Sequence, residues 1–236
     1  MWNDYQYISA SEQKNKAKKT LEKMKKSNQD IEPIIITGNK IAKTWWGIAW
    51  NKNLESYADY SNRIGRGRSY LRNGYVLDLK IKTGQIIGLV QGSGRRPYTV
   101  EITIGKLPQK KWETILKKCS HKIDSLTDLA NGQFPKELGE IFLTKESGLF
   151  PTPKEIDFYC SCPDSAYMCK HVAAVLYGIG SKLDEEPLLF FKLRAIDCES
   201  LIKKSVEEKM ANLLQNATNK TERVIDDVDI NALFGL

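Results

Sequence analysis

The amino-acid sequence predicts an α+β protein: a small antiparallel β meander with helices, followed by a cysteine-rich knuckle inserted between C-terminal helices. Three observations lead to this prediction. Apolar and polar residues alternate along residues 76–104, as they do in strands with one buried face. Apolar residues recur at helical spacing before and after that stretch. Three cysteines and a histidine then fall within twelve residues, from Cys160 to His171.

The first predicted element is a basic arm over residues 1–30, which we expect to be helical or partly disordered. The arm has seven lysines against four acidic residues. Residues 10–26 have helical spacing but only a narrow apolar stripe, made of Ala17, Leu21 and Met24.

A strand and a helix are predicted next. Pro33–Ile36 suggests a first strand. Thr44 is suited to cap a helix that runs to about Ala58 and carries Trp46, Trp50 and Leu54 on one face. We interpret the tryptophans as core residues rather than as a platform on which bases stack.

The three-stranded antiparallel meander begins after Gly74. Alternating apolar residues mark its strands at 76–81, 86–90 and 100–104, and glycine-containing turns separate them at 82–84 and 92–97. With the helices around it, the meander makes up a predicted α+β domain over residues 31–148 that has basic loops rich in glycine and arginine.

Helical spacing returns after Pro108, at residues 112–119, 123–129 and 138–142. The first segment leads into Cys119-Ser-His121, a second pair of possible metal ligands. Residues two apart on a helix point in different directions, and no second cysteine pair stands nearby in the sequence. We therefore prefer a buried cysteine beside a solvated histidine.

The C-terminal third is predicted to hold the knuckle with flanking helices (149–216) and a tail (217–236). Leu149–Pro153 cannot continue a helix because it contains two prolines. Apolar residues then predict a helix from about Glu185 to Asn216, in which Cys198 is expected to be inert. An acidic linker leads to apolar Ile230–Leu236, either a docking peptide or a last element folded onto the core.

The knuckle contains a Cys-x-Cys pair (Cys160, Cys162) and, six residues later, a Cys-x-His pair (Cys169, His171). Zinc prefers thiolate and imidazole donors, and the loop between the two pairs is short enough to bring them together. The four side chains are therefore predicted to bind one zinc ion. Accidental spacing and a disulfide are the alternatives. Adjacent-but-one cysteines make a strained disulfide, and the five cysteines of the chain are an odd number.

The residues around these ligands predict a strand, a turn and a helix. Glu155–Tyr159 alternates polar and apolar residues, and Pro163-Asp164 is typical of a turn. A short helix with an apolar face follows, ended by Gly178 or Gly180, and places His171 in its first turn.

Four protein ligands would close the coordination shell, whereas catalytic zinc normally keeps one position open. The zinc is therefore expected to be structural. Asp164 is the only acid between the ligand pairs and is assigned to the turn. Lys170 is interpreted as a solvated lysine, with charge compensation of the thiolates as the alternative. The chain has only two histidines and no evident pair that would activate a nucleophile, so we expect no enzyme.

The Cys-x-Cys and Cys-x-His pattern resembles the SWIM zinc finger. Further segments resemble the bacterial SWIM zinc finger proteins often encoded beside Swi/Snf-type helicase-like ATPases: Thr44-Trp-Trp-Gly-Ile-Ala-Trp50, Tyr57-Ala-Asp-Tyr60, Arg63-Ile-Gly-Arg-Gly-Arg-Ser-Tyr70, Arg72-Asn-Gly74, Val90-Gln-Gly-Ser93 and Leu149-Phe-Pro151. The resemblance covers roughly residues 30–200. It implies zinc binding by the four knuckle residues and a role in binding DNA or protein partners.

The positive charge is concentrated in the N-terminal half of the chain. The whole chain carries +7, residues 63–96 alone carry +7, the basic arm adds +3, and the remainder is acidic. Such an uneven distribution is the electrostatic signature of a protein that binds a polyanion.

Six arginines and a tyrosine in this region are the candidate nucleic-acid contacts. Glycines beside them would let the backbone approach a ligand, guanidinium groups grip phosphate, and interleaved tyrosines such as Tyr60, Tyr75 and Tyr98 offer rings for stacking. An equally weighted alternative is that the tyrosines pack on the sheet and the arginines solvate its edge. The candidates are Arg63, Arg66, Arg68, Arg72, Arg95, Arg96 and Tyr70.

Two functions follow from these patterns. The favoured one is a non-catalytic module that binds nucleic acid, DNA rather than RNA, and acts with a Swi/Snf-type ATPase. The alternative is an adaptor whose finger helix and C-terminal tail dock on a protein partner. No apolar run is long enough to cross a bilayer and no secretory signal begins the sequence, so a cytoplasmic protein is expected.

Overall fold

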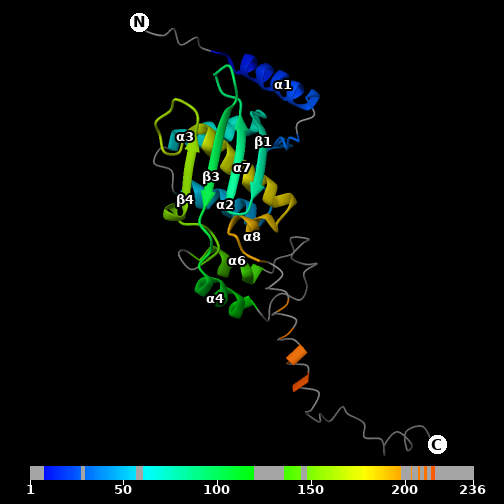
Figure 1. The fold of residues 1–236 in the computed structure, drawn as a ribbon, viewed down its shortest axis with the longest axis vertical. Coiled ribbons are helices and arrows are strands. Elements are labelled where there is room, and N and C mark those ends of the chain that lie inside the picture. Colours follow the sequence, from blue (N-terminus) through cyan, green and yellow to red (C-terminus); the bar gives the residue numbers. More distant parts are fainter. Residues whose placement is uncertain are drawn as a thin grey trace, which may run out of the picture.

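A computed structural model gives the fold of the chain (Figure 1). The structure describes residues 8–27, 30–56, 61–119, 136–144 and 148–197, together with the isolated positions 203, 207, 210, 211, 214 and 215. Several predicted features lie outside these residues: the helix at 123–129, Tyr60, His121, Cys198, the acidic linker and the apolar C-terminal segment.

The sheet has four antiparallel strands in the order β1-β2-β3-β4. The predicted meander is confirmed as β1 (Val76–Lys82), β2 (Gln85–Val90) and β3 (Tyr98–Ile104). The predicted strand of the knuckle is confirmed as β4 (Ile156–Cys160), and it pairs with β3 so that Ile102 lies opposite Phe158. The knuckle is therefore built directly onto the edge of the sheet.

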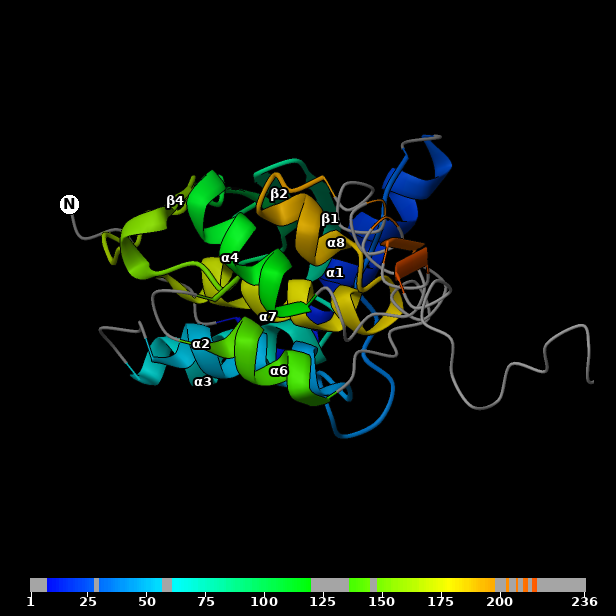
Figure 2. The same cartoon turned by 90° about the horizontal axis from the view of Figure 1, so that it is seen from below.

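A single helix, α7 (Lys170–Glu185), lies at the centre of the molecule. The sheet packs on one side of it, and α2 (Trp45–Glu55) and α3 (Ser61–Arg72) pack on the other (Figure 2). Eleven of the sixteen residues of α7 are buried, as expected of a helix that is covered all round. The fold has three layers, and the middle layer is the helix that follows the knuckle.

This helix continues past the two glycines that were predicted to end it. Gly178 and Gly180 both lie inside α7, so the predicted helix end is wrong. A β-carbon at Gly180 would clash with Asn51 of α2, and a β-carbon at Gly47 of α2 would lie 2.7 Å from the carbonyl oxygen of Gly180. Gly47 and Gly180 therefore serve the close crossing of two helices, whereas a β-carbon at Gly178 would lie 3.0 Å from the Leu79 side chain of β1. Burial outweighs the low helix propensity of these glycines.

The N-terminal arm is a helix, α1 (Ala10–Lys26), over the residues predicted. Ser9 and Glu12 form a capping box at its start, and Ala17 is its buried residue. The helix docks on the loop between β2 and β3, where Lys16 donates to the carbonyl oxygens of Ser93 and Gly94.

Pro33–Ile36 does not form the predicted strand. The segment runs beside β1, with hydrogen bonds from the Ile34 N–H to Val76 and from the Leu79 N–H to Glu32. Pro33 has no N–H to donate, so no regular ladder forms here.

The helix after this segment begins where it was predicted and ends at Glu55, and the predicted end near Ala58 lies outside the described residues. Thr44 caps α2, and the buried indole of Trp50 donates to the carbonyl oxygen of Leu176 in α7 over 2.9 Å. Trp46 donates in the same way to Leu183. These tryptophans are core residues, as predicted.

The remaining elements are short helices at one end of the sheet: α4 (Gln109–Cys119), α6 (Lys136–Leu143), a 3-10 turn (Pro153–Glu155) and α8 (Leu189–Leu193). The continuous helix predicted from Glu185 to Asn216 is wrong at its start. The chain leaves α7 at Glu186, turns at Pro187, which cannot continue a helix, and α8 ends before Ala195, which has a positive φ.

One hydrophobic core joins residues from Ala17 to Leu193, so the segments before and after residue 149 share it. Among the described residues, no helix has both the length and the apolar character needed to span a membrane.

Candidate metal centre

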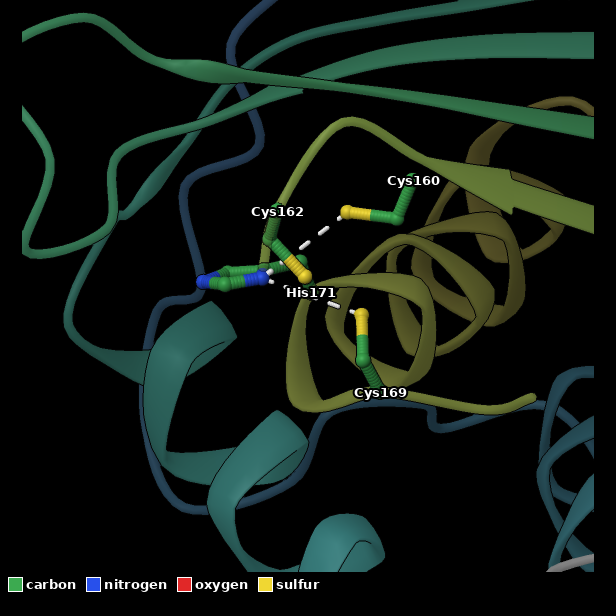
Figure 3. Close-up of side chains that lie close together, drawn as sticks. All are labelled: Cys160, Cys162, Cys169 and His171. Atoms are coloured by element: carbon green, nitrogen blue, oxygen red, sulfur yellow. Dashed lines mark hydrogen bonds between the residues drawn. The ribbon is translucent and has the colours of Figure 1, made fainter. Parts of the chain in front are cut away.

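The four predicted ligands come together where β4 meets α7 (Figure 3). Cys160 is the last residue of β4, and Cys162 lies in the loop that follows. Cys169 is the N-cap of α7, and His171 lies in its first turn. In Figure 3 the three sulfur atoms and one imidazole nitrogen point toward a common centre. The predicted first-turn position of His171 is confirmed.

The spacing of the ligand atoms fits zinc. All four lie within 4.8 Å of one another, and Nδ1 of His171 is 3.7 Å from Sγ of Cys169 and 3.9 Å from Sγ of Cys160. Zinc bonds of about 2.3 Å to sulfur and about 2.0–2.1 Å to nitrogen put tetrahedral ligand atoms about 3.6–3.8 Å apart. The cysteines are free thiols, so the donors are available to a metal.

Cys169 is the donor whose thiolate is most favoured. Its pKa is lowered to about 4, first by the hydrogen bond with Cys160 and then by His171 and the backbone N–H of Val172. That N–H is at the positive end of α7, where a negative charge is stabilised. The pKa of Cys160 is raised, because its thiol hydrogen-bonds to Cys169 and is partly buried.

His171 presents its two ring nitrogens to different surroundings. Nδ1 faces the sulfurs, while Nε2 is buried and has no hydrogen-bond partner among the described residues. The ring lies against Tyr98 and Tyr70, with centroids 4.8 Å and 5.3 Å away. A metal on Nδ1 leaves the proton on Nε2, so the buried nitrogen becomes a hydrogen-bond donor.

The loop between the ligand pairs is attached to α3. Asp164 accepts a hydrogen bond from the backbone N–H of Ala166, which is the turn role predicted for it, and forms an ion pair with Arg63 at 3.2 Å. This contact joins the knuckle to the arginine-rich segment, which is about a hundred residues earlier in the chain.

That arginine-rich segment is not the predicted loop. Residues 63–72 belong to helix α3, and Gly67 packs against α7 instead of approaching a ligand. The helix separates the candidate contacts. Arg63, Arg66 and Tyr70 share one face, which lines a cavity of about 600 Å³ beside the metal centre.

The remaining arginines point elsewhere. Arg68 lies 4.0 Å from Glu55 and over the ring of Tyr177, and Arg72 donates to the carbonyl oxygen of Asn39. Arg95 and Arg96 are exposed in the loop between β2 and β3.

The cavity is also lined by residues outside the list of candidate contacts, among them Lys170, Gln13 and Tyr98, of which Tyr98 is one of the predicted rings for stacking. Lys170 projects into it between two metal ligands, and burial, followed by the nearby Arg66, lowers the pKa of its ammonium group. Tyr98, from the start of β3, and Gln13 of α1 also line it. Their grouping depends on three elements that lie far apart in the sequence. For Lys170, the signal was its place between Cys169 and His171.

Residues 154–178 match the SWIM zinc finger family. The curated protein named Uncharacterized protein Rv2102, from Mycobacterium tuberculosis, is 35% identical over 167 residues, which are 70% of this chain and 60% of that protein. The chain thus matches less than two thirds of this relative's length. No solved structure matches the chain. Family match, donor set and geometry agree that this is a SWIM zinc site.

Proposed function

We propose, from the SWIM zinc finger at residues 154–178, that the protein is a non-catalytic module that binds nucleic acid, DNA rather than RNA. In this proposal the zinc ion holds the end of β4 against the start of α7. Four protein donors fill its coordination shell, so the ion acts on architecture and not on a substrate.

The observation that carries the proposal is the arrangement of basic residues around one cavity. The arginines of α3 and those of the β2–β3 loop form two clusters in the sequence, and both segments contribute walls to the cavity, through Arg66 and Ser93 respectively. Arg66, Arg95 and Arg96 are exposed. Cations around one cavity of a protein that carries +7 raise the local concentration of a polyanion.

Partnership with a Swi/Snf-type helicase-like ATPase is part of the proposal. It is supported by the resemblance of the chain to SWIM proteins encoded beside such ATPases. We expect an ATPase to copurify with the protein and to stay bound after nuclease treatment. Loss of the ATPase on nuclease treatment would contradict a direct contact.

The adaptor function receives less support. It needs an accessible apolar face on the finger helix, but α7 lies between the sheet and two helices, and its apolar residues are buried. A partner therefore has no access to that face in the folded protein.

The test is the salt dependence of DNA binding by the zinc-loaded protein. Fluorescence anisotropy with labelled single- and double-stranded oligonucleotides is measured between about 50 and 200 mM salt. If four phosphates are neutralised, affinity for single-stranded DNA should fall about fiftyfold over this range, because counterions are released on binding. Salt-independent affinity, or no binding at micromolar protein, would contradict the proposal.

A further inference from the structure

We propose that the cavity beside the zinc centre is a binding site for the phosphate group of a nucleotide. The cavity lies between α1, α3, the β2–β3 loop and the knuckle, and its volume is about 600 Å³. That volume is within the range of small-molecule sites, which is roughly 300–1,000 Å³. The inference takes the proposed function as its premise for the kind of ligand and adds where and how that ligand is held.

The cavity holds cations without anionic partners. Arg63 is paired with Asp164. Arg66 and Lys170 have no carboxylate within the 4.0 Å ion-pair distance among the described residues. Lys170 lies 5.8 Å above the ring of Tyr70, an arrangement that orients its ammonium group without neutralising it. The three cations and one carboxylate of the wall sum to +2, and a zinc ion with three thiolates contributes −1. The cavity and the zinc centre together therefore stay positive, which is a suitable environment for a phosphate.

The zinc ligand His171 supplies the second, independent observation. Its side chain is 1% exposed and lines the cavity, and its Nε2 lacks a hydrogen-bond partner among the described residues. Imidazoles that bind zinc almost always donate their other N–H to an oxygen acceptor. A phosphate oxygen in the cavity would be that acceptor, and it would link the ligand directly to the zinc centre.

The other wall residues suit a nucleoside attached to this phosphate. Tyr98 and Tyr70 lie against the His171 ring and line the cavity with aromatic side chains, and Gln13 and Ser93 line it from α1 and the β2–β3 loop. Aromatic rings beside phosphate-binding cations are the combination that single-stranded nucleic acid requires.

A competing explanation is that Arg66 and Lys170 only balance the negative charge of the three zinc thiolates. The two explanations differ in what removal of the cations changes. Charge balance predicts loss of zinc from the variants, whereas a phosphate site predicts unchanged zinc and weaker ligand binding.

The experiment compares two double variants that remove the same charge. Arg66→Gln with Lys170→Gln alters the cavity, and Lys106→Gln with Lys154→Gln removes exposed cations outside its wall. Each zinc-loaded protein is titrated with inorganic phosphate, thymidine 5′-monophosphate and an oligothymidylate without terminal phosphates, and its zinc content is measured. We expect the cavity variant to keep its zinc and to bind each probe that binds the unmodified protein at least about thirtyfold more weakly. The affinity of the control variant for the same probe should change less than about threefold.

The three probes distinguish the source of the phosphate. Binding of the monophosphate identifies a terminal phosphate, and binding of the oligothymidylate alone identifies an internal one. Either result should also shift the Nε2–H resonance of His171 in a side-chain ¹H–¹⁵N spectrum.

Three results would overturn the site: equal losses in both variants, zinc loss confined to the cavity variant, or no binding of any probe. Oligothymidylate binding that survives in the cavity variant would reject the cavity and keep the proposed function. Monophosphate binding that needs Arg66 and Lys170, without any oligonucleotide binding, would keep the cavity and reject the proposed function.

Discussion

Gly67 of α3 faces Ala173 of α7 at a distance that leaves no room for a side chain. A β-carbon at position 67 would lie 2.5 Å from the β-carbon of Ala173 and 3.0 Å from its carbonyl carbon. The helices cross here because one of them lacks a side chain. Since α7 carries His171 and α3 carries Arg66, this crossing also sets the distance between the zinc centre and the basic face of α3.

Replacing Gly67 with alanine should destabilise the protein by about 1–3 kcal/mol, because the added methyl group meets backbone atoms that cannot move independently. Gly65 is the matched control. It lies in the same helix, is exposed, and a β-carbon there would meet nothing within 4 Å. Gly65→Ala should therefore stabilise the protein by up to about 1 kcal/mol. Urea unfolding measures both, and equal effects would reject the close-crossing role.

Cys169→Ser should remove zinc and local structure together. The serine hydroxyl replaces the donor whose thiolate is the most favoured of the set, and structural zinc sites supply on the order of 10 kcal/mol of folding free energy in finger peptides. Metal analysis and circular dichroism measure the two effects. Cys119→Ser, at a cysteine that is not one of the four predicted ligands, should keep its zinc. Full zinc occupancy in Cys169→Ser would refute the ligand assignment.

The ion pair between Glu155 and Arg194 predicts a pH dependence of stability. Burial acts to raise the pKa of Glu155, but hydrogen bonds from the buried Arg194 and from Thr152 outweigh it and hold the pKa below its usual 4.5. A lowered pKa in the folded state means that this stabilisation is complete above about pH 4.5 and is lost as the pH falls through the folded value.

Glu155→Gln should therefore cost about 1.5–3 kcal/mol at neutral pH, and the difference from the unmodified protein should shrink in acid. Urea unfolding at a series of pH values measures this difference. Zinc is released by acid from both proteins, so its contribution cancels. Glu101→Gln, at an exposed glutamate of β3, serves as the control. A stability difference that stays constant with pH would exclude the carboxylate as its origin.

A fourth prediction concerns the start of α2. Asp184 of α7 accepts hydrogen bonds from the backbone N–H groups of Lys43 and Thr44 and from the Thr44 hydroxyl. Asp184→Ala leaves these donors without their acceptor and should cost about 1–3 kcal/mol. Glu185→Ala, at the exposed neighbouring residue, should change stability by less than about 0.5 kcal/mol. Thermal unfolding compares the two, and similar losses would contradict this role of Asp184.

Local features of the fold are predicted correctly by the sequence. The meander, the cap of α2 by Thr44, and α1 depend on neighbouring residues, and their signals are alternation, capping and helical spacing. The errors concern proline and glycine. The predicted strand at Pro33–Ile36 and the start of the helix predicted from Glu185 are wrong because proline interrupts regular structure there. The predicted helix ends at Gly178 and Gly180 and the predicted loop around Gly67 are wrong, because tertiary contacts hold all three glycines inside helices.

The zinc ligands can be identified from the amino-acid sequence because all four lie within twelve residues, so a short loop is enough to bring their donors together. The cavity beside them cannot be identified in this way. Its walls come from α1, α3, the β2–β3 loop and the knuckle, and only the packing of α7 between the sheet and α3 brings Arg66, Lys170 and His171 to one place. The sequence by itself determined the metal chemistry, which depends on donor type and short spacing. Tertiary structure decided which cations surround the metal site, because that depends on helix crossings whose closeness is set by residues without side chains.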